Sequence, residues 1–188
     1  YYTKPINFGG STYKGLANFG GSTYKGLANF SESIYEKDVI FSTSESRSTY
    51  LGRTDFGGST YKGLANFRDS TYEGEADFSD STYKGEANFS NSTYVGKADF
   101  SGSTYKKDVT FSTYTYNRRS TYKGEANFSG STYEGEANFS SSTYEKDVTF
   151  STPIFRSTYV GKADFRGSTY QGGAYFSRST YQEEAYFT

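Results

Sequence analysis

The chain has 188 residues, of which 20% are aromatic, and it contains no Cys, His, Met or Trp. The 20 basic and 21 acidic residues are well mixed and leave a net charge of −1, which argues against nucleic-acid binding. No apolar run approaches the roughly 20 residues that a membrane span requires. Leu, Val and Ile are too scarce for an ordinary core, so a folded chain must have an aromatic one.

From its first residues the chain follows a repeat. Phe recurs every 11 residues at positions 8, 19, 30 and 41, then from 56 to 111, from 128 to 150 and from 165 to 187, with a Tyr six residues before each. The unit is A-[ND]-F-x-x-S-T-Y-x-G-x. An 11-residue period also occurs in right-handed coiled coils, but the Gly, Ser-Thr and aromatic residues of each unit disfavour a helix. Conserved positions within the repeat favour a stacked register over a disordered, low-complexity chain.

Alternation along each half of the unit predicts a β-solenoid. Ala and Phe point inward with Asn or Asp outward, and in the other half Ser and Tyr point inward with Thr outward. Gly at the corners permits tight turns. The unit cannot bury its own apolar face, but stacking buries a continuous core. The predicted core ladder contains Phe56, Phe78, Phe100, Phe67, Phe89, Phe111, Tyr61, Tyr72, Tyr83 and Tyr94.

Segments such as ANFSG at 126–130, ADFSD at 76–80 and ADFSG at 98–102 resemble the pentapeptide-repeat family, with S-T-Y-x-G as a second variant. The resemblance covers essentially the whole chain. It implies an all-β, right-handed quadrilateral β-helix that spans residues 1–188 as a single repeat solenoid. The chain departs from the family in the extra residue of its second unit and in the Tyr that replaces Leu or Phe.

Four units of this length predict about 22 residues per coil instead of 20 and about eight coils in all, forming a rod roughly 40 Å long. The residue before Phe supports this period, because it alternates between Asp and Asn at Asp55, Asn66, Asp77, Asn88 and Asp99. Odd and even units therefore lie on opposite faces.

Three interruptions break the register. Each replaces G-x-A by K-D-V, puts Val39, Val109 or Val148 in the inward Ala position, and then adds four, six and four residues. We expect corner loops near 42–47, 112–119 and 151–156, because an insertion at a corner leaves the stacking undisturbed. Candidate loop contacts for a partner are Tyr114, Tyr116, Arg118, Arg119, Ile154 and Phe155. The alternative explanations are drift of the repeat and a local plug over a coil that Val makes wider.

Chemistry-bearing motifs are few. Without His or Cys the common catalytic triads and zinc sites are excluded, and Ser and Thr occupy structural positions of the repeat, so we expect neither an enzyme nor a cofactor. The stacked Asp55, Asp77 and Asp99 would repel one another unless a cation, or Arg53 and Lys97, relieves them, and we favour the two basic side chains. Charged neighbours of the Thr residues argue against an ice-binding surface.

Two functions are compatible with the sequence. The first is a structural solenoid that associates head to tail with copies of itself or forms part of a longer one, with Tyr1, Tyr2, Tyr175 and Tyr186 as candidate self-association residues. The second is a scaffold that binds an unidentified protein through its loops. Some pentapeptide-repeat proteins mimic DNA with an acidic rod, but the near-zero net charge of this chain disfavours that role.

Overall fold

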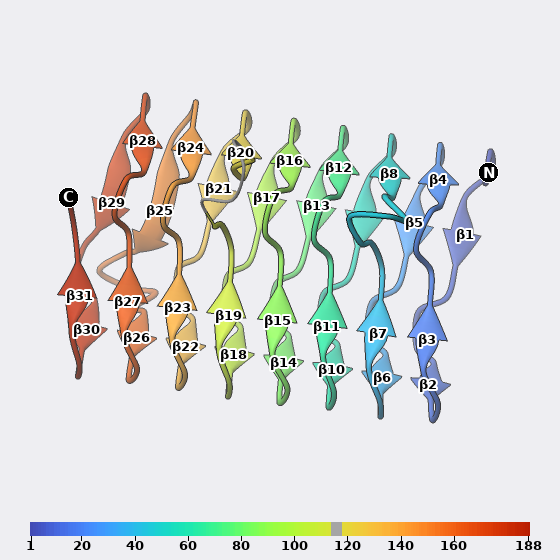
Figure 1. Cartoon of the computed structure of the whole chain (residues 1–188), viewed down its shortest axis with the longest axis horizontal. Coiled ribbons are helices and arrows are strands. Elements are labelled where there is room, and N and C mark those ends of the chain that lie inside the picture. The colour runs from blue at the N-terminus through green and yellow to red at the C-terminus, as the bar shows by residue number, and fades with distance from the viewer. Residues whose placement is uncertain (114–117) are drawn as a thin grey trace.

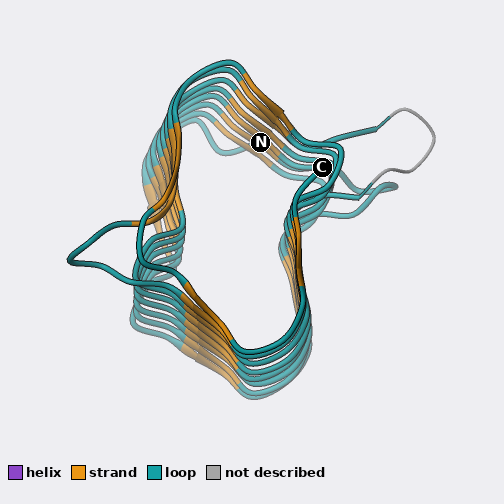
Figure 2. Ribbon diagram, turned by 90° about the vertical axis from the view of Figure 1, so that its left-hand side faces the viewer, coloured by secondary structure: helices purple, strands orange, loops and turns teal. Residues whose placement is uncertain are grey.

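The computed structural model describes residues 1–113 and 118–188, and in these ranges the chain forms 31 short strands and no helix. The strands build a four-sided β-helix in which each coil contributes one strand to each side (Figures 1 and 2). No helix among the described residues could cross a membrane. The all-β solenoid predicted from the sequence is confirmed, with four parallel sheets and eight coils.

Each of the four sheets collects every fourth strand. Sheet 1 contains β1 (Ile6–Asn7), β5 (Ala28–Asn29), β9 (Thr54–Asp55), β13 (Ala76–Asp77), β17 (Ala98–Asp99), β21 (Ala126–Asn127), β25 (Val148–Ser151) and β29 (Ala174–Phe176). Sheet 2 contains β2 (Thr12–Tyr13), β6 (Ile34–Tyr35), β10 (Thr60–Tyr61), β14 (Thr82–Tyr83), β18 (Thr104–Tyr105), β22 (Thr132–Tyr133), β26 (Thr158–Tyr159) and β30 (Thr180–Tyr181).

The strands of sheet 3 resemble those of sheet 1, and the strands of sheet 4 resemble those of sheet 2. Sheet 3 contains β3 (Ala17–Asn18), β7 (Val39–Ile40), β11 (Ala65–Asn66), β15 (Ala87–Asn88), β19 (Val109–Thr110), β23 (Ala137–Asn138), β27 (Ala163–Asp164) and β31 (Ala185–Tyr186). Sheet 4 contains β4 (Thr23–Tyr24), β8 (Thr49–Tyr50), β12 (Thr71–Tyr72), β16 (Thr93–Tyr94), β20 (Thr121–Tyr122), β24 (Thr143–Tyr144) and β28 (Thr169–Tyr170). Tyr2 joins this sheet through a bridge to Tyr24.

The pairing register confirms the 22-residue coil. In undisturbed coils Thr60 pairs with Thr82, 22 residues later. Across the three insertions the partner lies further along the chain, because Thr23 pairs with Thr49, Thr93 with Thr121 and Thr132 with Thr158. The insertions fall between strands of adjoining sheets, so the strands keep their neighbours.

Aromatic rings fill the inside of the solenoid as four stacked ladders. The Phe rings that follow sheets 1 and 3 meet edge to face at the centre, as Phe56 and Phe67 do at 5.1 Å and 79°. Within one ladder the rings stack, with 4.9 Å between the centroids of Phe56 and Phe78 and 4.7 Å between those of Tyr61 and Tyr83. Both arrangements suit the aromatic quadrupole and add stability beyond the buried area. The ten core-ladder residues predicted from the sequence are all buried.

The Tyr ladders carry polar atoms into this apolar core. Tyr61 donates its hydroxyl to the carbonyl of Phe56 at 3.4 Å, but the hydroxyl of the adjacent Tyr83 has no partner among the described residues. Burial raises the pKa of Tyr83 well above its ordinary value. Near the last coil, where Tyr170 is partly exposed, burial raises the pKa of that phenol to about 12.

Serine side chains satisfy the backbone where each coil turns. Ser81 donates its hydroxyl to the carbonyl of Phe56 at 3.4 Å and accepts the backbone N–H of Ser59 at 3.2 Å. Ser103 repeats the pattern one coil later, accepting from Ser81 and donating to Phe78. The inward Ser of the S-T-Y unit is therefore a hydrogen-bonding residue as well as a small one.

Two kinds of corner follow the Tyr strands. At Gly74 the backbone lies so close to the preceding coil that a Cβ atom would stand 2.5 Å from the carbonyl carbon of Gly52. The K-D-V units use a different arrangement, in which Asp38 accepts the backbone N–H of Leu64 from the next coil at 2.9 Å. Asp108 and Asp147 accept equivalent N–H groups at 2.9 and 2.8 Å. The aspartate of K-D-V therefore ties its corner to the next coil.

Candidate functional sites

The insertions fall at two opposite edges of the solenoid, as the strands that flank them show (Figure 2). The first loop, 42–47, and the second, 112–119, both connect sheet 3 to sheet 4, whereas the third, 151–156, connects sheet 1 to sheet 2. Tyr114 and Tyr116 lie outside the described residues. The first two loops therefore share one edge, and the third stands alone on the other.

The first and third loops have the same backbone scheme. In the first, Thr43 N–H donates to the carbonyl of Ser46 at 3.1 Å and Ser46 N–H donates to Thr43 Oγ1 at 3.0 Å. In the third, Thr152 and Phe155 form the same pair of bonds at 3.0 and 2.8 Å. The turn is thus set by the threonine and by the backbone, and the side chain at its last position is free to differ.

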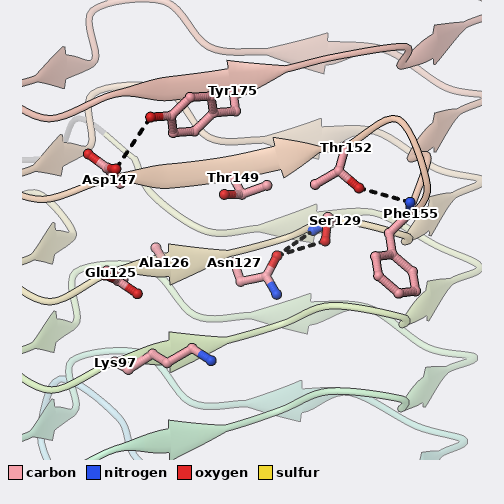
Figure 3. A pocket seen from close by; sticks show the side chains of 10 residues that line it. All are labelled: Lys97, Glu125, Ala126, Asn127, Ser129, Asp147, Thr149, Thr152, Phe155 and Tyr175. Atoms are coloured by element: carbon pink, nitrogen blue, oxygen red, sulfur yellow. Dashed lines mark hydrogen bonds between the residues drawn. The ribbon is translucent and has the colours of Figure 1, made fainter.

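A groove of about 350 Å³ lies on sheet 1 beside the third loop (Figure 3). The rings of Phe155 and Tyr175 stand on either side of it, with Thr149 and Asn127 between them. It is lined by Lys97, Glu125, Ala126, Asn127, Ser129, Asp147, Thr149, Thr152, Phe155 and Tyr175. The groove therefore has a polar floor and two aromatic walls.

Two exposed aromatic side chains line this groove, and the exposed Ile154 precedes one of them in the third loop. Ile154 and Phe155, both predicted as loop contacts, are 83% and 63% exposed. Tyr175, predicted as a self-association residue, is 48% exposed and takes the outward position that Thr149 holds one coil earlier. Its hydroxyl donates to Asp147 at 3.4 Å. The structure thus brings together residues that the sequence assigned to two different functions.

A cleft of about 410 Å³ lies between the first and second loops. It is lined by Arg47, Asp69, Ser70, Thr71, Asn91, Thr93, Arg118, Arg119, Thr121 and Thr143. Arg118 Nη1 lies 3.0 Å from Asp69 Oδ1, and Arg68 Nε lies 3.1 Å from Asp69 Oδ2. Arg118 is therefore more than a solvated loop residue, since it pairs with a buried carboxylate.

The row of aspartates on sheet 1 is confirmed by the pairing of Asp55 with Asp77 and of Asp77 with Asp99. Arg53 Nη2 lies 3.7 Å from Asp77 Oδ2, and Lys97 Nζ lies 3.3 Å from Asp99 Oδ2. Burial raises the pKa of Asp55, and the neighbouring Asp77 carboxylate adds to this. The expected basic side chains thus offset the repulsion between the carboxylates. Among the described residues, no cluster of three or more Asp or Glu side chains is arranged to hold a metal ion.

The four predicted self-association residues occupy different surfaces. Tyr2 belongs to an aromatic ladder, since its ring stacks 5.0 Å from that of Tyr24. Tyr1 is exposed beside Lys25, whose Nζ lies 5.4 Å from the ring centroid. Tyr186 takes an outward position on sheet 3, under the guanidinium of Arg166 at 4.6 Å and bonded to the Glu184 carboxylate. Tyr175 and Tyr186 thus face sideways, whereas Tyr2 extends an end ladder.

Sequence reasoning missed Arg47 and Asp69. No motif marks either residue, but they are 22 residues apart, which is one coil. This spacing places Arg47 and Asp69 in successive coils at the same corner. The cleft could have been predicted from this spacing.

Comparison with known proteins identifies the repeat. The family model for pentapeptide repeats (9 copies) matches residues 73–113. Searches of curated proteins and of solved structures find no match. The matched segment lies in the regular middle of the solenoid, and the same strand register extends from β1 to β31. Residues 73–113 are therefore similar to the pentapeptide repeats of that family, and the described chain forms a β-solenoid scaffold with the same register on both sides of this segment.

Proposed function

We propose that the solenoid is a structural scaffold that holds its third loop and the adjoining groove against a protein partner. The observation that carries this proposal is the exposure of Ile154 and Phe155, at 83% and 63%, beside the half-exposed Tyr175. Large apolar side chains around a groove with a polar floor are the usual centre of a protein interface. We further propose that the chain is not an enzyme, because its sequence lacks His and Cys.

The fold does not require these apolar side chains. Ser46 in the first loop occupies the position of Phe155 in the third and makes the same two hydrogen bonds. Ser44 and Glu45 stand where the third loop has Pro153 and Ile154. An exposed Ile-Phe pair lowers solubility without stabilising the turn, which favours a role in binding.

The scaffold also holds the groove in position before binding. Phe155 accepts the N–H groups of Thr152 and Gly130 on its carbonyl, at 3.0 and 3.2 Å, which ties the loop to its own coil and to the preceding one. Ser151 Oγ accepts the N–H of Ser157 at 3.0 Å and closes the base of the loop. A loop ordered in this way loses less conformational entropy when a partner binds.

A photo-crosslinking experiment tests this proposal. A benzoylphenylalanine is placed at Phe155 and, as a matched control, at Ser46 of the equivalent first loop, and each protein is irradiated in an extract of the source cells. We expect a discrete crosslinked protein from position 155, absent from position 46 and competed away by unlabelled wild-type chain but not by its Phe155→Ser variant. Crosslinks that are the same from both loops, or that both competitors displace equally, would contradict the proposal.

A second candidate function is end-to-end association of this 188-residue chain, or continuation of its coils in a longer solenoid. The supporting observation is that rings of the outermost coils, such as Phe8, Tyr13, Phe176 and Tyr181, are only partly buried, whereas the ladder rings between them are enclosed. A further coil in the same register would bury these rings and pair the open strand edges.

Negative-stain electron microscopy of the 188-residue chain at micromolar concentration tests this second candidate. Head-to-tail stacking predicts rods of uniform width that extend well beyond the roughly 40 Å of one chain. Tyr181→Asp in the end ladder should shorten the rods, whereas Tyr175→Ser on the side face should not. Particles that stay short at high concentration would contradict head-to-tail association.

A further inference from the structure

The cleft between the first and second loops carries a concentration of positive charge. Three arginines line it, namely Arg47, Arg118 and Arg119, and Asp69 is the acidic residue in its lining. Among the described residues, the lining therefore has more basic than acidic side chains. Glu45 at the tip of the first loop does not belong to the lining.

Asp69 anchors the arginines instead of neutralising the cleft. Its carboxylate is 3% exposed, and both of its oxygens are occupied, one by Arg118 and the other by Arg68. Arg118 is itself 49% exposed, so much of its guanidinium faces solvent. A buried carboxylate saturated by two cations orients Arg118 and leaves the outer guanidinium surface for another anion.

The floor adds hydrogen-bonding groups to this charge. Thr71, Thr93 and Thr121 stack in successive coils of sheet 4 and place their outward side chains in the cleft. Asn91 also lines it, and its buried Oδ1 has no hydrogen-bond partner among the described residues. By contrast, Asn88 Oδ1 is engaged by the N–H and hydroxyl of Ser90. The Asn91 side chain therefore adds to the lining an amide whose oxygen is not engaged by the described residues.

We propose that this cleft binds a phosphate monoester group. The lining contains arginines of two separate loops, Arg47 of the first and Arg118 of the second, which suits the several oxygens of a tetrahedral group better than the two of a carboxylate. A monoester carries a charge close to −2 at neutral pH, whereas a phosphodiester carries −1, so the exposed arginines of the lining, Arg47 and Arg118, attract the monoester more strongly. This site is on the edge opposite the third loop and does not depend on the function proposed for that loop.

Binding is measured by isothermal titration calorimetry in a low-salt buffer at pH 7.5. The probes are inorganic phosphate, a short phosphoserine peptide and the same peptide without phosphate, so that the free group and the protein-borne group are distinguished. We expect saturable binding of one phosphate per chain and no binding of the unphosphorylated peptide. Tighter binding of the phosphopeptide than of inorganic phosphate would identify a modified protein as the source, and the reverse would identify a small phosphate ester.

Arg47→Gln is the principal variant, because it leaves the Asp69 ion pairs intact. It should weaken phosphate binding about tenfold, as expected for one lost charge-assisted hydrogen bond. Arg156→Gln is the matched control, since Arg156 holds the same position in the third loop and should leave the affinity unchanged. Affinity for the phosphopeptide should also fall below about pH 6, where the phosphate gains a proton.

Failure to bind either phosphorylated probe would overturn the proposal, as would equal weakening by Arg47→Gln and Arg156→Gln, which would indicate attraction by overall charge. Circular dichroism of each variant verifies that the solenoid is folded.

Discussion

Alkaline pH should unfold this protein cooperatively, because its core is made of phenols. The largest fully buried side chains among the described residues are twelve tyrosines, from Tyr24 to Tyr159. Burial raises the pKa of each of them above the ordinary value of 10.0, as at Tyr50, Tyr94 and Tyr122. In the unfolded chain the same phenols ionise near pH 10.

The sign and the size of the effect follow from linkage. A group whose pKa is raised by folding contributes stability below its unfolded pKa, and this stability is lost as the pH rises toward the folded pKa. One pH unit above 10, each phenol favours the unfolded chain by about 1.4 kcal/mol, so that twelve favour it by roughly 17 kcal/mol. This exceeds the stability of a typical domain, about 5–15 kcal/mol, and predicts unfolding between about pH 10 and 11.

Phenolate absorbance near 295 nm and far-ultraviolet circular dichroism, followed on the same samples, test this prediction. The absorbance of the buried tyrosines should rise in one steep step that coincides with the loss of β structure. A guanidinium-unfolded sample, as the control, should titrate smoothly around pH 10. A smooth titration of most tyrosines in a chain that keeps its circular dichroism would refute the reasoning, because the phenols would then be accessible to solvent in the folded state.

Three substitutions test other contacts by urea denaturation. Tyr83→Phe should raise the free energy of unfolding by about 1 kcal/mol, since it removes a buried, unpaired hydroxyl. Tyr61→Phe should give no gain, because the Tyr61 hydroxyl is hydrogen-bonded. Equal effects of the two substitutions would contradict this difference between the hydroxyls. Gly74→Ala should cost about 3 kcal/mol because its Cβ would meet the preceding coil, whereas Gly15→Ala, at the same repeat position with nothing within 4 Å, should be tolerated. Ser141→Gly should stabilise by about 0.5–1 kcal/mol, because residue 141 has φ of 58°; a loss would show that its side chain contributes.

Much of the fold could be predicted because the spacing of the repeat indicates both the length of a coil and which residues point inward. The 11-residue spacing of Phe and Tyr, together with the Asp and Asn alternation from Asp55 to Asp99, gave the coil length and the inward residues before any contact was known. In a stacked coil each residue lies beside the residue 22 positions later, as Asp55 lies beside Asp77. Residues separated by one sequence period are therefore neighbours in space. The charge relief by Arg53 and Lys97 followed from the same rule.

The candidate sites were harder to predict because they combine residues across coils and loops. The groove joins Phe155 of one loop to Tyr175 of a later strand, and the cleft joins Arg118 to Asp69, which is 49 residues earlier in the chain. The sequence by itself determined the solenoid, its period and its aromatic core, since these follow from a local pattern that every coil repeats. Only the tertiary structure decided which loops share an edge and which charges meet there, because the chain path around the coil assigns each corner to a side.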